Sequence, residues 1–152
     1  MGRTFSDYLA FLRQLIPILE QLTAVEQRKL AAVQADDLPA VNDCMKEEQA
    51  LSMTLRGLEQ KRARLRAELS LPEMRLRELP QHCPPELAAE TAQVVDAVLG
   101  KSQVLSSAQK AARTVMETRL HRIDKALRRR GLAEEDNLAP PPGGGSRTDI
   151  KV

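Results

Sequence analysis

Apolar residues recur at steps of three and four along most of this chain, and this spacing constrains its fold more than any other feature. The first such stripe consists of Phe5, Leu9, Leu12, Ile16, Leu19, Leu22, Val25, Leu30 and Val33. Leu15 and Ile18 make it wider than the seam of a two-stranded coiled coil. We therefore expect a helix that packs against more than one neighbour.

The composition agrees with long helices. Aromatic residues make up only 2% of the 152 residues and charged residues 29%, so the apolar content is mainly Leu, Ala, Val and Met. Compact cores normally use more aromatic side chains, because these bury large areas. We predict an all-α protein.

The stretch "ADDLPAV" ends one helix and begins the next. Asp36 or Asp37 can accept hydrogen bonds from the free N–H groups of a new helix, and Pro39 is tolerated only in a first turn. So short a connection makes the two helices antiparallel neighbours of roughly 45 Å. The sequence predicts a long hairpin of helices at about 4–35 and 37–70.

The two helices of this hairpin differ in regularity. Pro17 stands inside the first one and crowds the preceding turn, so that helix either kinks or begins late, and we favour the kink. The second helix carries polar residues at several steps of its stripe. That stripe consists of Leu38, Val41, Met45, Leu51, Leu55, Leu58, Leu65 and Leu69.

Four prolines separate the hairpin from the rest of the chain, at Pro72, Pro80, Pro84 and Pro85. They leave room for a short helix at about 73–79, expected to cap the end of the hairpin. A third long helix follows at about 86–130, and Gly131 after three arginines is a typical stop signal. Residues 1–131 are thus predicted to form a three-helix, coiled-coil-like bundle.

Residues 132–152 contain "PPPGGG" and no periodic apolar face. Such a segment cannot bury enough surface to offset the entropy of ordering it. We predict a flexible Pro/Gly-rich tail. Its last residues, "TDIKV", are either a tethered docking element or, as composition favours, plain solvated chain.

Nothing in the sequence has the pattern of an enzyme's active site. There is no Gly-rich phosphate loop, no H-E-x-x-H motif and no nucleophile elbow. Adjacent carboxylates such as Glu47 and Glu48 are expected on solvated helix faces. Cys83 and its neighbour His82 supply two of the four ligands that a structural zinc site needs, and His121 has no partner at catalytic spacing. We predict no catalytic residue, no cofactor and no metal.

The charges are balanced, with 23 Lys and Arg against 21 Asp and Glu. Two basic clusters, Lys61 to Arg66 and Arg128 to Arg130, are candidates for nucleic-acid contacts, but neither contains aromatic residues for base stacking. No apolar run reaches the roughly 18 residues of a membrane span, and the N-terminus lacks a signal peptide's pattern. We therefore expect a cytoplasmic protein without nucleic acid or membrane insertion.

The third expected helix continues its apolar stripe toward the tail, and this stripe is the candidate partner-binding surface. Small residues in it allow a second helix to approach closely, and a methionine lets the surface adapt. Alternatively, the stripe simply packs on the other two helices. The candidate residues are Leu105, Ala108, Ala112, Met116, Leu120, Ile123 and Leu127.

Three short patterns resemble the FlgN-type flagellar export chaperones: "ADDLPAV" at the restart, "KEEQAL" from Lys46 and "LEQKR" from Leu58. The order of two long helices, a proline-broken middle, a third long helix and a Pro/Gly-rich end is also similar. The family often carries paired asparagines in its third helix, where this chain has Ser102 and Gln109.

The resemblance implies a cytosolic, non-enzymatic chaperone. Its partners would be the C-terminal helices of the hook–filament junction proteins FlgK and FlgL, delivered to the type III export apparatus through contact with components of the export gate. In the family, substrate binding is associated with the C-terminal region, which here is the later part of the third helix and the tail. Two alternatives stay open: a structural coiled-coil homo-oligomer, and a nucleic-acid binder that uses the basic clusters.

Overall fold

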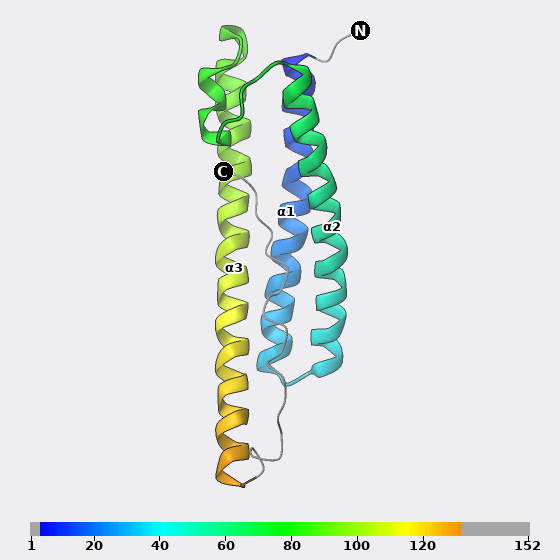
Figure 1. Cartoon of the computed structure of the whole chain (residues 1–152), viewed down its shortest axis with the longest axis vertical. Helices are drawn as coiled ribbons and strands as arrows, with labels where there is room; N and C mark the ends of the chain where they lie inside the picture. Colours follow the sequence, from blue (N-terminus) through cyan, green and yellow to red (C-terminus); the bar gives the residue numbers. More distant parts are fainter. Residues whose placement is uncertain (1–3, 132–152) are drawn as a thin grey trace.

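The structure is a computed structural model that describes residues 4–131. These residues form three long helices and two short 3-10 helices and contain no strand. The elements are α1 (Phe5–Gln34), α2 (Leu38–Glu68), η1 (Leu76–Gln81), η2 (Pro85–Leu87) and α3 (Ala88–Arg129). The prediction of an all-α protein with three long, packed helices is confirmed (Figure 1). The expected tail at 132–152 lies outside the described residues.

Side-chain caps fix where α1 and α2 begin. The hydroxyl of Thr4 accepts the N–H of Asp7 at 3.2 Å, and the Asp7 carboxylate accepts the N–H of Thr4 at 2.9 Å, which is a capping box. At the hairpin turn the backbone of Asp36 has a φ of 56°, and the carboxylate of Asp37 accepts the N–H of Ala40 at 3.1 Å. Of the two aspartates that the sequence offered, Asp37 is therefore the cap of α2.

Replacing Thr4 by Ala is expected to lower the free energy of unfolding by about 1 kcal/mol, because a free N–H of the first turn loses its acceptor. Urea denaturation followed by circular dichroism would measure this loss. Thr4→Ser keeps the hydroxyl and should leave stability nearly unchanged. Equal losses in the two variants would show that the methyl group, and not the cap, matters.

α1 runs without interruption through Pro17, which lies exposed on its outer side. The helix therefore does not begin late. The missing N–H of proline deprives the carbonyl of Arg13 of its usual partner. Because this side of α1 faces solvent, water can satisfy that carbonyl at little cost.

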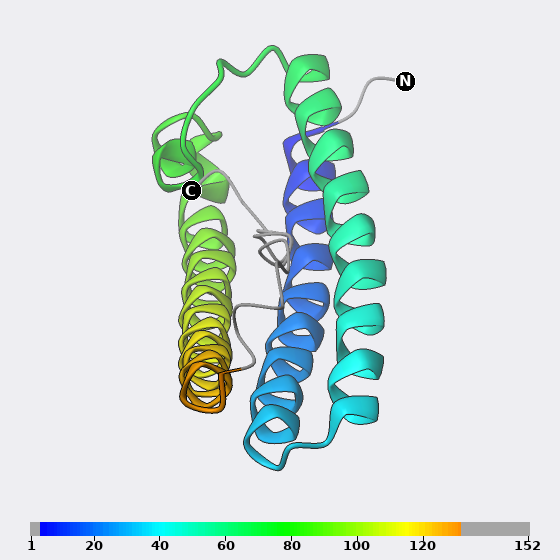
Figure 2. The same ribbon diagram turned by 60° about the horizontal axis from the view of Figure 1, so that its bottom comes forward.

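α1 lies between α2 and α3, and these two helices pack mainly on α1 (Figure 2). The apolar face of α1 is wide enough to contact two helices, which explains why α2 and α3 both pack on it. Ion pairs mark both interfaces: Arg13 pairs with Glu90 of α3, and Lys29 pairs with Glu48 of α2. The leucines of α1 with no exposed surface are Leu9, Leu12, Leu15, Leu19 and Leu22.

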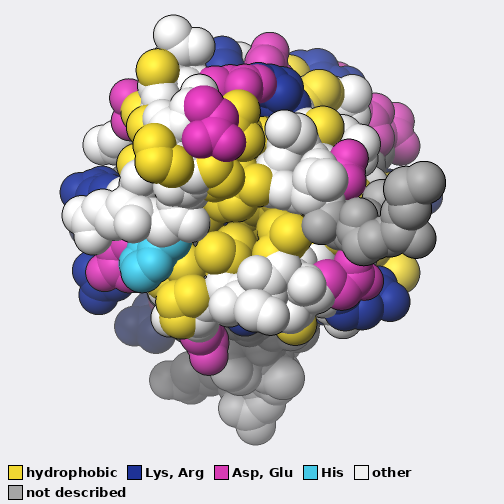
Figure 3. Space-filling view, turned by 90° about the horizontal axis from the view of Figure 1, so that it is seen from above, with side chains coloured by type: hydrophobic (Ala, Val, Ile, Leu, Met, Phe, Trp, Pro, Cys, Tyr) yellow, Lys and Arg dark blue, Asp and Glu magenta, His cyan; other side chains and the backbone are white. Residues whose placement is uncertain are grey.

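The segment between α2 and α3 closes one end of the bundle. An extended stretch carries the chain from α2 across to α3, with Leu71 and Met74 against the core. η1 then buries Leu76 and Leu79 and packs on α3. The short helix is thus a 3-10 helix beside α3, slightly later in the chain than the prolines suggested. Figure 3 looks onto this end and shows hydrophobic side chains gathered at its centre.

Candidate partner-binding surface

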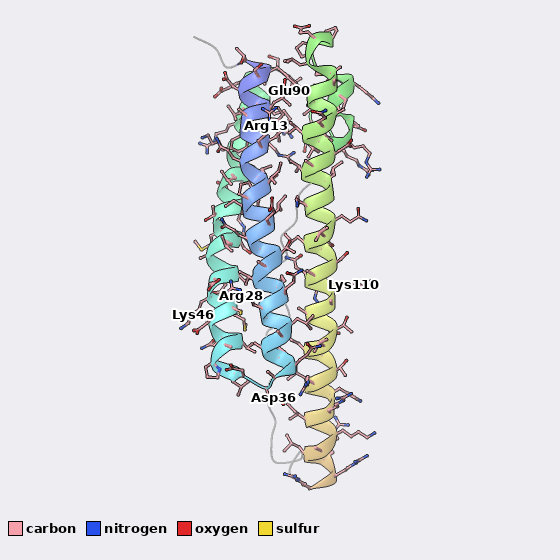
Figure 4. All side chains as sticks on the ribbon, turned by 180° about the vertical axis from the view of Figure 1, so that it is seen from behind. Arg13, Arg28, Asp36, Lys46, Glu90 and Lys110 are labelled. Atoms are coloured by element: carbon pink, nitrogen blue, oxygen red, sulfur yellow. The ribbon has the colours of Figure 1, made fainter. Side chains whose placement is uncertain are left out.

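α3 projects beyond the hairpin, because it has 42 residues whereas α1 has 30 and α2 has 31. Arg119 marks the level where the projection begins. Its guanidinium donates to the carboxylate of Asp36 at 2.8 Å and to the carbonyl of Gln34 at 2.9 Å, both at the hairpin turn. Figure 4 shows Asp36 at this turn and α3 continuing past it. Residues 120–129, which we call the overhang, extend about 15 Å beyond the hairpin.

The first part of the predicted stripe is covered by the bundle. Leu105 and Ala112 are only 2% and 1% exposed, and Ala108 is half-buried. A partner cannot reach Leu105 or Ala112 unless the bundle opens. In this part of α3, packing within the chain accounts for the apolar residues.

The second part of the stripe is more open. Leu120 and Ile123 are 50% and 56% exposed, and Met116 and Leu127 are half-buried. These four residues, the open stripe, follow one another at steps of four, three and four and continue the buried face of α3 in register. α1 ends at Gln34, level with Arg119, so it does not extend over the overhang.

Basic side chains surround the open stripe. From Arg119 to Arg130 the chain has six Arg or Lys residues and a single acidic one, Asp124. Arg128 is bound to Asp124 at 3.1 Å, and Arg119 is bound to the hairpin turn. The surface that α3 offers beyond the hairpin is therefore both apolar and positively charged.

A second exposed apolar area lies on α2 near the hairpin turn. Leu38 is 76% exposed and Met45 41%, and they line a shallow hollow together with Pro39, Val41 and Asn42. The sequence placed Leu38 and Met45 on the packed stripe of the second helix, which was wrong for both. Two members of the predicted stripe, Leu55 and Leu65, are buried, and the other buried residues of α2 are Cys44, Glu48, Ser52 and Arg62.

Three charged side chains are buried between α1 and α2: Glu26, Lys29 and Glu48, with exposed fractions of 1%, 8% and 6%. The Lys29 ammonium lies 3.2 Å from Glu26 Oε2 and donates a hydrogen bond to Glu48. Burial disfavours the charged form of Glu26 and, with a hydrogen bond shared with Glu48, raises its pKa to about 7. Without access to solvent, this cluster serves the packing of two helices and not a substrate.

This cluster was not predicted from the sequence, and Glu48 was expected on a solvated face. A signal was nevertheless present on α1. After Leu22, the steps of four, three and four along the apolar stripe fall on Glu26, Lys29 and Val33. Charged residues at stripe positions three residues apart indicate a buried ion pair.

The basic cluster near the end of α2 is partly used within the fold. The ammonium of Lys61 lies 5.6 Å from the ring centroid of Phe11, close enough for a cation–π contact. Arg62 is 6% exposed and pairs with Glu59 at 2.9 Å. The Lys61 contact therefore joins α2 to α1, whereas the Arg62 pair lies within α2.

In the part of the chain that the structure describes, no three His, Cys, Asp or Glu side chains are grouped so that they could hold a metal ion. Cys44 and Cys83 are free thiols. None of the helices among residues 4–131 has the length and apolar character needed to cross a membrane.

A family model described as FlgN protein matches residues 1–129, from the first residue to the end of α3. The chain belongs to the FlgN family. FlgN proteins are flagellar export chaperones, so this is a chaperone of flagellum biogenesis. Comparison with curated proteins and with solved structures gave no match. In this FlgN protein the open stripe lies within the region that the family model covers.

Proposed function

We propose that this FlgN-family protein binds the C-terminal helices of hook–filament junction proteins of the FlgK and FlgL type in the cytoplasm and delivers them to the type III export apparatus. The observation that carries the proposal is the open stripe, a partly exposed apolar helix face that continues past the end of α1. An amphipathic helix is the partner that fits such a face, because its apolar residues recur at the same spacing.

A client helix along the overhang would cover Leu120 and Ile123, the two most exposed residues of the open stripe. A client segment that is unfolded before binding would fold as it binds, and this ordering costs several kcal/mol. The net affinity therefore stays moderate although apolar surface is buried. Moderate affinity suits a carrier that must release its client at the export apparatus.

Isothermal titration with peptides that span the C-terminal helix of FlgK or FlgL from the same organism tests the proposal. We expect one-to-one binding with a micromolar or lower Kd and a negative heat-capacity change from apolar burial. Ile123→Asp should weaken binding by about 30-fold or more, because it places a charge in the apolar contact. Circular dichroism should show an unchanged helix content, since Ile123 is 56% exposed.

Val104→Asp is the matched control, because Val104 lies on the same helix, is 53% exposed and is outside the open stripe. It should bind the peptide as the native protein does. Equal losses in both variants, or no loss with Ile123→Asp, would contradict the assignment of the open stripe. A stable oligomer that gives no heat with either peptide would favour the structural coiled-coil function instead.

A further inference from the structure

We propose that residues 132–138, the first part of the tail, fold back along the overhang and cover the open stripe when no partner is bound. The overhang is the docking surface and this acidic segment of the same chain is its occupant. Three observations support the proposal: the turn at the end of α3, the length of the segment and the charges on both sides.

α3 ends at a left-handed glycine. Gly131 has a φ of 71°, and its N–H donates to the carbonyl of Arg128 at 3.0 Å. A left-handed glycine with this hydrogen bond is the Schellman type of helix end. In this motif the residue after the glycine commonly contacts the third residue of the helix from its end. Here these residues are Leu132 and Leu127, so this contact would place Leu132 at the end of the open stripe.

The segment has the length to cover the whole open stripe. From Leu132 to Leu138 an extended chain spans about 20 Å at about 3.3 Å per residue. From Leu127 back to Met116 the helix spans about 17 Å. With Leu132 beside Leu127, Leu138 would therefore reach the level of Met116. The prolines and glycines begin only after this point, at Pro140.

The charges of the two segments are complementary. The segment contains Glu134, Glu135 and Asp136 and no basic residue. On the other side, Arg122 and Lys125 of the overhang have no carboxylate partner among the described residues. Opposite charges held within a few ångströms attract each other, and salt weakens the attraction. A second copy of the chain would instead bring two positively charged overhangs together, which disfavours a homodimer through this surface.

One consequence rests on the proposed function. A client helix would have to displace residues 132–138 before it binds. Its apparent affinity would then equal its intrinsic affinity multiplied by the fraction of chains in which the open stripe is uncovered. The free chaperone would also avoid presenting its own apolar stripe to unrelated proteins.

Hydrogen exchange on the full chain tests the inference without any partner. We expect the triple variant Glu134→Lys, Glu135→Lys, Asp136→Lys to accelerate exchange of the amides at 116–127 by about tenfold. Amides at 94–105, in the bundle, should exchange as before. The control Asp149→Lys changes a carboxylate beyond the glycines and should leave both regions unchanged.

The salt dependence of exchange and a variant without the two leucines provide a second, independent test. Raising NaCl to 0.5 M should accelerate exchange at 116–127 in the native chain but not in the triple variant. Leu132→Ser with Leu138→Ser should have the effect of the triple variant while keeping every charge. In titrations with client peptides, both variants should bind about tenfold more tightly than the native chain.

Identical exchange at 116–127 in the native chain, the triple variant and the leucine variant would overturn the inference. Protection that increases with protein concentration would also overturn it, because a second copy would then be the occupant. The exchange measurement contains no client. Faster exchange in the variants without any peptide binding would therefore support this inference and contradict only the proposed function.

Discussion

Replacing Lys29 by Met is expected to lower the free energy of unfolding by about 3–5 kcal/mol at pH 8. Lys29 is the cation that lies between the buried carboxylates of Glu26 and Glu48. Met keeps the volume of the side chain but leaves two negative charges facing each other in a site with little water. Urea denaturation at pH 8, followed by circular dichroism, measures the loss.

The loss should shrink as the pH falls from 8 to 6. The pKa of Glu26 is raised from 4.5 to about 7 in the folded protein, so the folded state binds this proton more tightly than the unfolded state does. The stability that comes from this group is fully present below about pH 4.5 and is lost as the pH rises through about 7. Lys29 lowers the pKa of Glu26, so in the Lys29→Met variant this pKa is higher than in the native protein. Protonating Glu26 in the variant would remove one of the two facing charges.

The double variant Lys29→Met, Glu26→Gln is the matched control. It leaves Glu48 as the one carboxylate of the cluster, so we expect it to be more stable at pH 8 than Lys29→Met alone. Its stability should also vary less between pH 6 and 8, because Glu26 no longer titrates. A Lys29→Met protein as stable as the native one at pH 8 would show that the buried ion pairs contribute nothing to folding.

A second large effect is expected within α3, at two adjacent residues. Leu105→Asp should cost more than about 4 kcal/mol and unfold much of the chain, because Leu105 is 2% exposed and the new carboxylate has no partner in the core. Val104→Asp, one residue earlier at 53% exposure, should change stability by less than about 0.5 kcal/mol. Thermal melts of the two variants compare them directly.

Comparing Leu105→Asp with Ile123→Asp also tests where the covered part of the stripe ends. Leu105→Asp should lose helix content whereas Ile123→Asp, on the overhang, keeps it. A folded Leu105→Asp protein would mean that α3 is free to leave α1 at this level. In that case the surface available to a partner would extend well above the hairpin turn.

The fold could be predicted from the sequence because the information is local and repeated. Each turn of α1 places another leucine on the same wide face, and that width alone requires two neighbours. The restart at the hairpin turn depends on one capping carboxylate and one proline, whose preferences hold in almost any context. Pro39 and one of two aspartates, Asp36 or Asp37, indicated where the second helix begins, and the structure places the cap at Asp37.

The candidate site could be predicted only in part, because exposure depends on how far one helix reaches past another. The spacing of Leu105 and Ile123 on α3 is equally regular, yet one is buried and the other half exposed. Their exposure differs because α1 ends at Gln34, and the sequence of α3 gives no information about where α1 ends. Leu38 was also misplaced: it is the first residue of α2, directly after the turn, and is 76% exposed.

The central position of α1 has a consequence for how the protein is made. α1 leaves the ribosome first and can form the hairpin as soon as α2 follows, but its other side waits for α3. Translating from Glu68 to Leu105 takes about 2–7 s at about 5–20 residues per second. During these seconds the nascent chain exposes an apolar helix face of its own, as the proposed client helices do before they are bound.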